Sequence, residues 1–510
     1  MSVEVAETTN RGRDRLHPEP RVEPLVFERS GHGKVGYSLP PLDVPAEVAI
    51  PERLRRAEIA GETEISEVEV ARHFTRLSRL NFSIDQGLYP LGSCTMKHNP
   101  RTNAEMARLP GFAASHPLAP EEVSQGSLEL AWRLERILAE LTGLSRVTLQ
   151  PSAGAQGELA GMLMVRRALE KAGRARTTVL IPDSAHGTNP ASAHFAGYKV
   201  KELKSNARGT LDVSVLETAM TEDVAALMLT VPNTLGIFEN QILEIAKVVH
   251  AKGGYLYCDG ANFNSFVGVA KPGLMGIDVM HMNLHKTFST PHGGGGPGSG
   301  PVAVTEKLVP FLPRPTVERR SDGTFTLDYD RPESIGRLRT FLGNYGMFVR
   351  ALAYISAYGN RIGEVARGAV LNANYIRAGL TGVYHLKYDA PSMHEVVFSD
   401  KTQAEHGVHG MDIAKRLMDF GFHPPTISFP LIVHGALMIE PTETEGKPGL
   451  DAFIEAMRRI AREAEEDPQI VLKAPHTTPV KRVDEVAAAR NLVLRWRPEV
   501  GRRETGDGKR

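Results

Sequence analysis

The feature that most constrains the fold is an alternation of short apolar runs with helical stretches between residues 156 and 304. The apolar runs have the length of strands, and the stretches around them repeat apolar residues at the three-to-four spacing of a helix. The expected strands are 177–182, 198–203, 225–231, 254–260, 277–282 and 301–304, and the expected helices include 156–172 and 240–252. This alternation predicts an α/β fold, with a mainly parallel sheet covered by helices on both faces.

The regions on either side of this core have different patterns of helices, strands and loops. We expect an amphipathic helix with Ser127 as its N-cap, and a long helical region at 347–380 with a glycine break. "LYPLGSCTMKHNP" reads as an ordered loop. The predicted divisions are an N-terminal arm with a helical and loop segment at 1–115, a large domain at 116–360, a smaller C-terminal α+β domain at 361–485, and a C-terminal tail at 486–510. We expect the charged, Gly-rich end of this tail, "GRRETGDGKR", to be disordered.

Charge and cysteine content exclude several classes of protein. Sixty Lys and Arg residues balance sixty Asp and Glu residues, so no overall charge favours nucleic acid or an anionic membrane. Two cysteines, Cys94 and Cys258, are too few for a disulfide framework and suit a reducing compartment. No secretory h-region and no apolar run of membrane-spanning length is present. We therefore expect a cytoplasmic protein that binds neither nucleic acid nor membrane.

Lys286, in "NLHKTFSTPHGGGGPGSGP", is the strongest candidate for covalent chemistry. The glycines here are not followed by Lys and a hydroxyl residue, so a P-loop is excluded. Asp259 ends an expected strand, and Ala261 points to the same side if the extended backbone continues. This combination suits pyridoxal 5'-phosphate: Lys286 forms the Schiff base, Asp259 keeps the pyridine nitrogen protonated, and Ala261 leaves room for the ring.

Three further segments could complete such a site. In "PSAGAQGE", the small residues Ala153, Gly154 and Ala155 lead into a helix, so backbone N–H groups and the helix N-terminus could bind phosphate. A plain helix start is the alternative. His186 follows a strand and could stack on the ring, although a lone histidine is more often structural. Asn233 also follows a strand and could hydrogen-bond the phenolic oxygen of the ring.

Several long motifs resemble those of the glycine cleavage system P-protein family, over roughly residues 65–490. They are "YPLGSCTMKHNPR", "PSAGAQGE", "DSAHGTNPAS", "CDGAN", "NLHKTFSTPHGGGGPGSGP", "FHPPTISFPLIVHGALMIEPTETE" and "APHTTPVKR". The resemblance implies a fold-type I pyridoxal-phosphate enzyme and the C-terminal-half subunit that carries the cofactor lysine. Departures from the family pattern at His434-Gly435 and at Gly446 look peripheral to the chemistry.

The resemblance also implies a role for each matching residue. Lys286 would form the Schiff base, Asp259 would pair with the ring nitrogen, and His186 would stack on the ring with Ala261 behind it. The backbone at Gly154 and Ala155 would hold the phosphate with Asn283, His285 would line the pocket, and "LGSCTMKHNP" would help to form its mouth.

The activity implied by the resemblance is the decarboxylation of glycine, with release of CO2. The aminomethyl group would pass to the lipoyl arm of H-protein. The implied partners are glycine, lipoylated H-protein, P-protein subunit 1 in an α2β2 heterotetramer, and the other components of the glycine cleavage system.

Alternatives remain open at this point. The chain could be another fold-type I enzyme, such as a cysteine desulfurase or an amino acid decarboxylase, or a non-catalytic scaffold subunit. Cys94 and His98 could be proposed as a metal pair, but two ligands are too few for structural zinc, so we expect no metal. The anchor of the substrate carboxylate is undecided among Arg337, Arg339, Arg350 and Arg361.

Overall fold

The computed structural model describes residues 23–44, 50–57, 62–293 and 298–494. The chain divides into two compact units, Ile84–Lys473 and a second one made of Met1–Ser83 with Ala474–Arg510. Part of the expected N-terminal arm, four residues around the glycine run and the end of the expected tail lie outside the described residues. The domain boundaries predicted from the sequence stay predictions.

A seven-stranded sheet forms the centre of the larger unit, in the order β1-β7-β6-β5-β4-β2-β3. β7 is antiparallel to both of its neighbours, and the pairs from β6 to β3 are parallel. The strands are β1 (Arg146–Thr148), β2 (Thr178–Pro182), β3 (Lys199–Leu203), β4 (Val224–Thr230), β5 (Tyr255–Gly260), β6 (Val279–Met282) and β7 (Val302–Val304). The six strands expected from the apolar runs are confirmed, and β1 was missed because it is so short.

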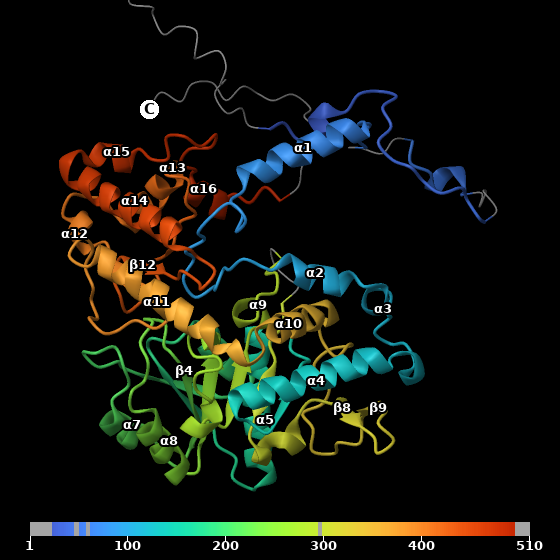
Figure 1. Cartoon of the computed structure of the whole chain (residues 1–510), viewed down its shortest axis with the longest axis vertical. Helices are drawn as coiled ribbons and strands as arrows, with labels where there is room; N and C mark the ends of the chain where they lie inside the picture. Colours follow the sequence, from blue (N-terminus) through green and yellow to red (C-terminus); the bar gives the residue numbers. More distant parts are fainter. Residues whose placement is uncertain (1–22, 45–49, 58–61, 294–297, 495–510) are drawn as a thin grey trace, which may run out of the picture. The chain divides into compact units, whose positions relative to one another are not determined.

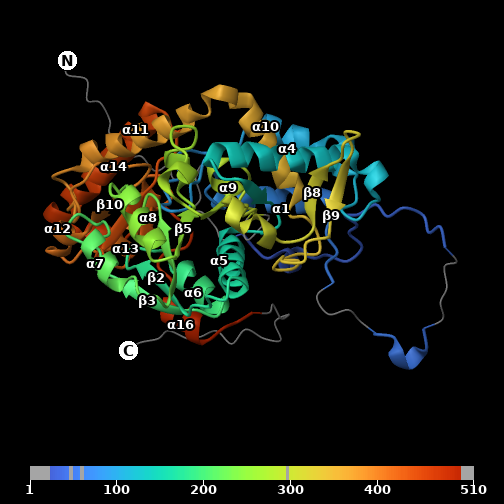
Figure 2. The same cartoon turned by 90° about the horizontal axis from the view of Figure 1, so that it is seen from below.

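Helices cover both faces of this sheet, as expected. They are α4 (Gln125–Thr142), α5 (Gly154–Lys171), α6 (Thr188–Phe195), α7 (Val213–Ala219), α8 (Ile242–Ala251), α9 (Leu284–Thr287) and α10 (Tyr345–Tyr358). Along β5, Leu256 and Cys258 pack into the core formed with α4, α8 and α10, whereas Tyr257 packs into the core formed with α5. Figure 2 shows α4 and α10 on one side and α5 and α6 on the other. Because helices cover both faces of the sheet, its strands carry apolar side chains on both sides.

The helix expected to start at an N-cap Ser127 begins earlier, at Gln125, and this prediction was wrong. The reason is a tertiary contact. Gln125 pairs with the backbone of Phe325 through both its amide oxygen (2.8 Å) and its amide nitrogen (2.9 Å). Phe325 opens β9 (Phe325–Asp328), which forms a hairpin with β8 (Thr316–Arg319) beside α4 (Figure 2).

A three-stranded antiparallel sheet, in the order β10-β12-β11, occupies the C-terminal part of the same unit. Its elements are β10 (Val396–Ser399), α12 (Lys401–Ala404), α13 (Gly410–Asp419), β11 (Thr426–Ile427), β12 (Ala436–Ile439), α14 (Lys447–Glu466) and α15 (Pro468–Leu472). Helix α11 (Gly363–Leu380) contacts both α14 and the short turn that follows β5, and so links the two sheets (Figure 1). Gly359, at φ 55°, makes the expected break between α10 and α11.

Four helices of the described residues lie outside these two sheets. In the larger unit, α2 (Arg101–Arg108) and α3 (Pro110–Ala113) pack on α10. In the other unit, α1 (Glu67–Leu80) starts with a capping box, and α16 (Glu485–Arg490) is capped by the Asp484 side chain. In the described parts of the chain, every helix is too short or too polar to cross a membrane.

Candidate active site

The carboxyl ends of three neighbouring strands place polar side chains next to one another. Thr230 of β4 lies opposite Asp259 of β5, and Asp259 lies opposite His281 of β6. A pocket of about 310 Å³ opens at this edge of the sheet. Its lining residues are Ser93, Cys94, Ala153, Gly154, Ala155, Glu158, His186, Thr188, Thr230, Thr234, Asp259, Ala261, Asn262, His281, Asn283, His285, Lys286 and His292.

Nine of the ten site residues named from the sequence line this pocket. Asn233 does not. Its amide nitrogen donates to Gly209 O (2.7 Å), and its amide oxygen accepts from the backbone N–H groups of Leu235 and Ile237 (3.0 and 3.2 Å). Because its own turn uses the amide oxygen and the Gly209 carbonyl takes the amide nitrogen, the expected contact with a ring oxygen does not fit. Thr234, the next residue, lines the pocket instead.

Asp259 is a buried carboxylate held by three donors. Asn189 Nδ2 donates to it at 3.0 Å, Ala261 N donates at 2.9 Å, and His281 Nε2 lies 3.2 Å away. Burial alone would raise the pKa of Asp259, but the His281 charge and these hydrogen bonds outweigh it and keep the pKa below its usual value. Asp259 is therefore ionised at neutral pH, as a partner for a protonated ring nitrogen must be.

Lys286 lies on the four-residue helix α9, directly after β6. Its Nζ donates to Ser93 O at 2.7 Å. Ser93 belongs to the loop Leu88–Pro100, which the sequence placed at the mouth of the site. Cys94 of the same loop also lines the pocket. Burial raises the pKa of the Cys94 thiol, so this group is protonated at neutral pH.

Two neutral histidines flank Lys286. Burial first, and then the nearby His292 and Lys286, lower the pKa of His285 to about 3. Burial and Lys286 lower the pKa of His292 to about 4. Asn283 Nδ2 lies 3.1 Å from His285 Nε2, and Ser299 N donates to His285 Nδ1 at 3.3 Å. These rings therefore add no positive charge beside the lysine at neutral pH.

The N-terminus of α5 forms the opposite wall. The first helical hydrogen bond of α5 is donated by Gly157 N to Ala153 O (3.0 Å), so the N–H groups of the preceding residues have no acceptor within the helix. A Cβ at Gly154 would lie 2.9 Å from Asn283 Nδ2 and 3.1 Å from His281 Nε2, so only glycine fits there. An anion at this point would meet both free N–H groups and the positive end of the helix dipole.

His186 lies at the open side of the pocket and is exposed. Its Nδ1 lies 2.8 Å from Thr188 Oγ1, and Thr188 Oγ1 in turn donates to Glu158 Oε1 at 2.8 Å. The His186 ring also meets Phe429 edge-to-face, with 5.6 Å between the ring centroids. This fixed imidazole can cover one face of a flat ligand.

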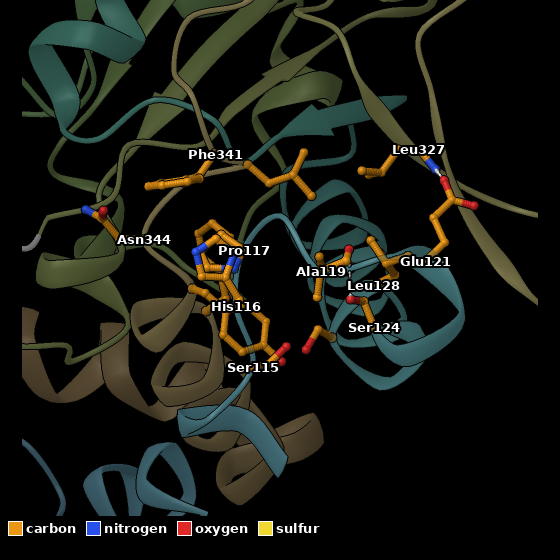
Figure 3. A pocket seen from close by; sticks show the side chains of 16 residues that line it. Ser115, His116, Pro117, Ala119, Glu121, Ser124, Leu128, Leu327, Phe341 and Asn344 are labelled. Atoms are coloured by element: carbon orange, nitrogen blue, oxygen red, sulfur yellow. Dashed lines mark hydrogen bonds between the residues drawn. The ribbon is translucent and has the colours of Figure 1, made fainter. Parts of the chain in front are cut away.

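A second cavity, of about 240 Å³, lies beside α4 and is lined mainly by apolar side chains (Figure 3). Two of its titratable residues, His116 and Glu121, are already bound to the backbone. His116 Nδ1 accepts from Leu118 N (3.1 Å), and Glu121 Oε1 accepts from Leu327 N (2.8 Å). The reactive groups therefore gather in the pocket of Lys286, which is the candidate active site.

Comparisons with known proteins fit this site. The family model described as "Glycine cleavage system P-protein" matches residues 34–324, and the model "Glycine dehydrogenase, C-terminal domain" matches residues 365–478. The chain belongs to the glycine cleavage system P-protein family. The expected family and its α/β fold are therefore confirmed.

Two curated relatives carry the name "Probable glycine dehydrogenase (decarboxylating) subunit 2". The protein of Caldanaerobacter subterraneus subsp. tengcongensis is 53% identical over 92% of this chain and 98% of its own length. The protein of Bacillus licheniformis is 55% identical, with the same two coverages of 92% and 98%. The match therefore extends over nearly the whole chain.

Solved structures share the fold at lower identity. A glycine decarboxylase (P-protein) in inhibitor-bound form has a TM-score of 0.65 and 22% identity, and the match covers 82% of this chain and 91% of that one. The cysteine desulfurase CsdA of Escherichia coli has a TM-score of 0.57 and 17% identity, with coverages of 76% and 97%. Within this shared fold, Cys258 is fully buried in β5, so its thiol could not reach a substrate as a desulfurase cysteine must.

Several lining residues were missed by the sequence reasoning. They are Glu158, Thr188, Thr230, Thr234, Asn262, His281 and His292. His281 and Thr230 could have been found, because each lies within one residue of the carboxyl end of a parallel strand next to Asp259. The four arginines considered for the substrate carboxylate are absent from the pocket lining. Two of them are held elsewhere: Arg339 donates to Asn344 Oδ1 (3.1 Å), and Arg361 pairs with Glu364 (2.7 Å).

Behind Lys286 lies a second lysine, Lys97, which is almost fully buried. Its Nζ donates to Glu443 Oε1 (2.7 Å), Thr287 O (2.8 Å), Asn264 Oδ1 (2.9 Å) and Tyr354 Oη (3.2 Å). Thr287 follows Lys286 and ends α9. Lys97 therefore fixes the backbone of the helix that carries Lys286.

Proposed function

We propose that this chain is the cofactor-bearing subunit 2 of glycine dehydrogenase (decarboxylating). It binds pyridoxal 5'-phosphate at Lys286, decarboxylates glycine with release of CO2, and passes the aminomethyl group to the lipoyl arm of H-protein. The observation that carries the proposal is one pocket in which the family lysine, a buried ionised aspartate and a helix N-terminus meet. Membership of the P-protein family and the names of its relatives support the same activity.

The residues present fit this cofactor. Asn283 Oδ1 and Thr230 Oγ1 are buried at the pocket and have no hydrogen-bond partner among the described residues. The N–H groups at the start of α5 suit a phosphate, and Gly154 keeps the wall there free of a side chain. Asp259 supplies the negative charge that a protonated pyridine nitrogen needs. A hydrogen-bonding ligand at this place would satisfy groups that are otherwise costly to bury.

Pyridoxal phosphate, when bound, draws electrons from the carbon atom that loses CO2. The protein does the remaining work. Lys286 Nζ would be the nucleophile that holds the cofactor. Asp259 would accept a hydrogen bond from the ring nitrogen and keep the proton there. His186 and Ala261 would lie against the ring, and the N-terminus of α5 would hold the phosphate.

The partners belong to the same proposal. Transfer to H-protein requires its lipoyl arm to reach the pocket, and the relatives' name "subunit 2" supports a P-protein subunit 1, for which we propose an α2β2 heterotetramer. A cytoplasmic location is proposed from the low cysteine content.

The exchange of labelled bicarbonate into glycine tests the proposal directly. It is measured first with this chain and pyridoxal phosphate, and then with subunit 1 and lipoylated H-protein added. We expect exchange in the complete mixture, and its loss in the Lys286→Ala variant. Lys252→Ala, which changes an exposed residue at the end of α8, is the matched control. Exchange that persists without Lys286 would refute the proposal.

A further inference from the structure

The loop that contacts Lys286 has an unusual backbone conformation. Ser93 and Thr95 both adopt left-handed conformations, with φ of 63° and 44°. Such angles are unfavourable for residues other than glycine, and most of all for a β-branched residue such as threonine. Strain of this kind persists only where the surrounding structure imposes it, and it often marks a functional segment.

Two buried glutamates impose this conformation. Ser93 N donates to Glu395 Oε2 (2.9 Å). Thr95 donates to Glu440 twice, from its N–H (3.0 Å) and from its hydroxyl (2.5 Å). Glu395 directly precedes β10 and Glu440 directly follows β12, and both side chains are fully buried. The carboxyl groups turn the loop so that Ser93 O accepts the hydrogen bond of Lys286 Nζ (2.7 Å).

Among the described residues, no charged side chain is hydrogen-bonded to the pair. His394 Nε2 lies 3.7 Å from Glu395 Oε1 and 3.9 Å from Glu440 Oε1, too far for a hydrogen bond. Both ring nitrogens of His394 and Glu395 Oε1 have no hydrogen-bond partner among the described residues. Burial lowers the pKa of His394 to about 3, so this ring is neutral. Two carboxylates in so dry a place cannot both be ionised unless a cation is near.

Four titratable groups face the pair: Lys286 from α9, Lys97 and Cys94 from the loop, and His394 from the segment before β10. The Cys94 thiol and His394 are neutral, and Lys97 is bound to Glu443. Burial and the neighbouring Glu440 raise the pKa of Glu395 well above its usual value, and burial raises that of Glu440 to about 7. Lys286 is the neighbouring cation whose bonding changes during the reaction.

We infer that Glu395 and Glu440, whose carboxyl oxygens lie within 4.8 Å of each other, position the Lys286 amine through the Ser93 carbonyl and supply the counter-charge of its ammonium form. The inference rests on the proposed function, in which Lys286 alternates between a covalent bond and a free amine. When the freed amine is protonated, one carboxylate of the pair is its counter-charge, and the ammonium and the carboxylate stabilise each other across the Ser93–Thr95 segment. When the amine is neutral or covalently bound, this counter-charge is not needed and the pair carries a proton instead.

The test measures the charge of Lys286 in the cofactor-free chain. Neutral amine reacts with the aldehyde of pyridoxal phosphate, so the rate at which the cofactor's absorption changes on mixing, followed against pH, reports the pKa of Lys286. In the Glu395→Gln/Glu440→Gln double variant the ammonium loses its counter-charge. We expect the midpoint of that profile to fall by about one pH unit or more. Each single variant keeps one carboxylate and should shift the midpoint less.

The control is Glu239→Gln. Glu239 is also a buried glutamate whose pKa burial raises to about 7, and it accepts a hydrogen bond from Leu211 N (3.1 Å). It does not line the pocket of Lys286, so its variant should keep the wild-type midpoint. Circular dichroism establishes that each variant is folded. A midpoint that is unchanged in the folded double variant would overturn the inference.

Two measurements that do not use the double variant keep the inference testable if that variant does not fold. Infrared spectroscopy of the cofactor-free chain should show a protonated-carboxyl stretch near neutral pH that weakens in either single variant. Absence of this stretch would overturn the inference. A divalent cation that metal analysis finds in a stoichiometric amount, and that a chelator removes, would also overturn it. If wild-type Lys286 takes up no pyridoxal phosphate at all, the proposed function itself fails.

Discussion

Two lysines lie a short distance apart in this unit, and their surroundings are opposite. Lys97 is surrounded by four acceptors and forms a buried ion pair with Glu443 at 2.7 Å. Lys286 lines an open pocket, and its one recorded hydrogen bond among the described residues goes to a backbone carbonyl. Lys97 has every proton of its ammonium in use, whereas Lys286 can exchange its single contact for a covalent bond. The same residue type is structural in one place and reactive in the other because of its partners.

The largest effect should come from removing the reactive lysine. In Lys286→Ala, glycine–bicarbonate exchange should fall by about 10³-fold or more, because no other group can take over covalent attachment. The folded structure should be unchanged, since Lys286 makes a single hydrogen bond there. Labelled-bicarbonate exchange and thermal unfolding, measured on the same preparation, check both parts. A strongly destabilised but active variant would reverse the assigned roles.

The structural lysine should show the reverse pattern. Lys97→Met leaves Glu443 buried without its partner, and we expect a loss of about 3–5 kcal/mol in the free energy of unfolding. Urea denaturation measures this loss. In the double variant Lys97→Met/Glu443→Gln no buried charge is left unpaired, so part of the stability should return. If the double variant is no more stable than the single one, the ion pair is not what Lys97 contributes.

The next largest effect should come from removing the carboxylate of Asp259, which faces the cofactor ring. Asp259→Asn removes the carboxylate but keeps the shape of the side chain. We expect exchange activity to fall by about 10²-fold, while pyridoxal phosphate still binds through Lys286. Absorption spectra of the bound cofactor and the exchange rate separate these two effects. An active variant with a normal spectrum would show that Asp259 does not interact with the ring.

The neutral histidines beside Lys286 should make the stability of the folded chain depend on pH. The pKa values of His285 and His292 are lowered to about 3 and about 4, so both rings take up protons more readily in the unfolded chain. Folded stability should therefore fall as pH drops below about 6.5, by up to about 1.4 kcal/mol per pH unit for each ring. In His285→Gln/His292→Gln this part of the slope should vanish. Urea unfolding of wild type and variant between pH 6.5 and pH 4 measures the difference.

The smallest effect should come from a lysine in an exposed ion pair. Lys447 Nζ lies 2.6 Å from Asp451 Oδ2 on the surface of α14. Solvent and salt screen such a pair, so Lys447→Met should leave the unfolding midpoint and the exchange rate unchanged. A loss comparable with that of Lys97→Met would mean that burial is not the source of the difference between the lysines.

Much of the site could be predicted from the sequence because it lies at strand ends. The apolar runs fixed where β5 and β6 stop, so Asp259 and Lys286 could be placed at one edge of the sheet. Asn233 also follows a strand, yet its side chain is bonded to its own turn and to Gly209 instead of facing the pocket. Position at a strand end therefore does not show where a side chain points.

The carboxyl pair could not have been predicted in this way. Glu395 and Glu440 lie far along the chain from the loop that contains Ser93 and Thr95, and only tertiary structure brings them together. Ser127 shows the same limit locally, since the pairing of Gln125 with Phe325 moved the helix start away from the expected cap. Contacts between distant segments carry no periodic signal in the sequence.

The loop Leu88–Pro100 contains no helix and no regular strand, yet it need not behave like an ordinary loop. The amide hydrogens of Ser93 and Thr95 are bonded to buried carboxyl groups, and the Lys97 side chain anchors the same segment. These amides should exchange with deuterium as slowly as the amides of the neighbouring β12. The reason is that exchange at both places requires a large opening of the structure, one that exposes both sheets. A loop held in this way does not open to admit substrate. Access to the pocket would then depend on the side that holds His186.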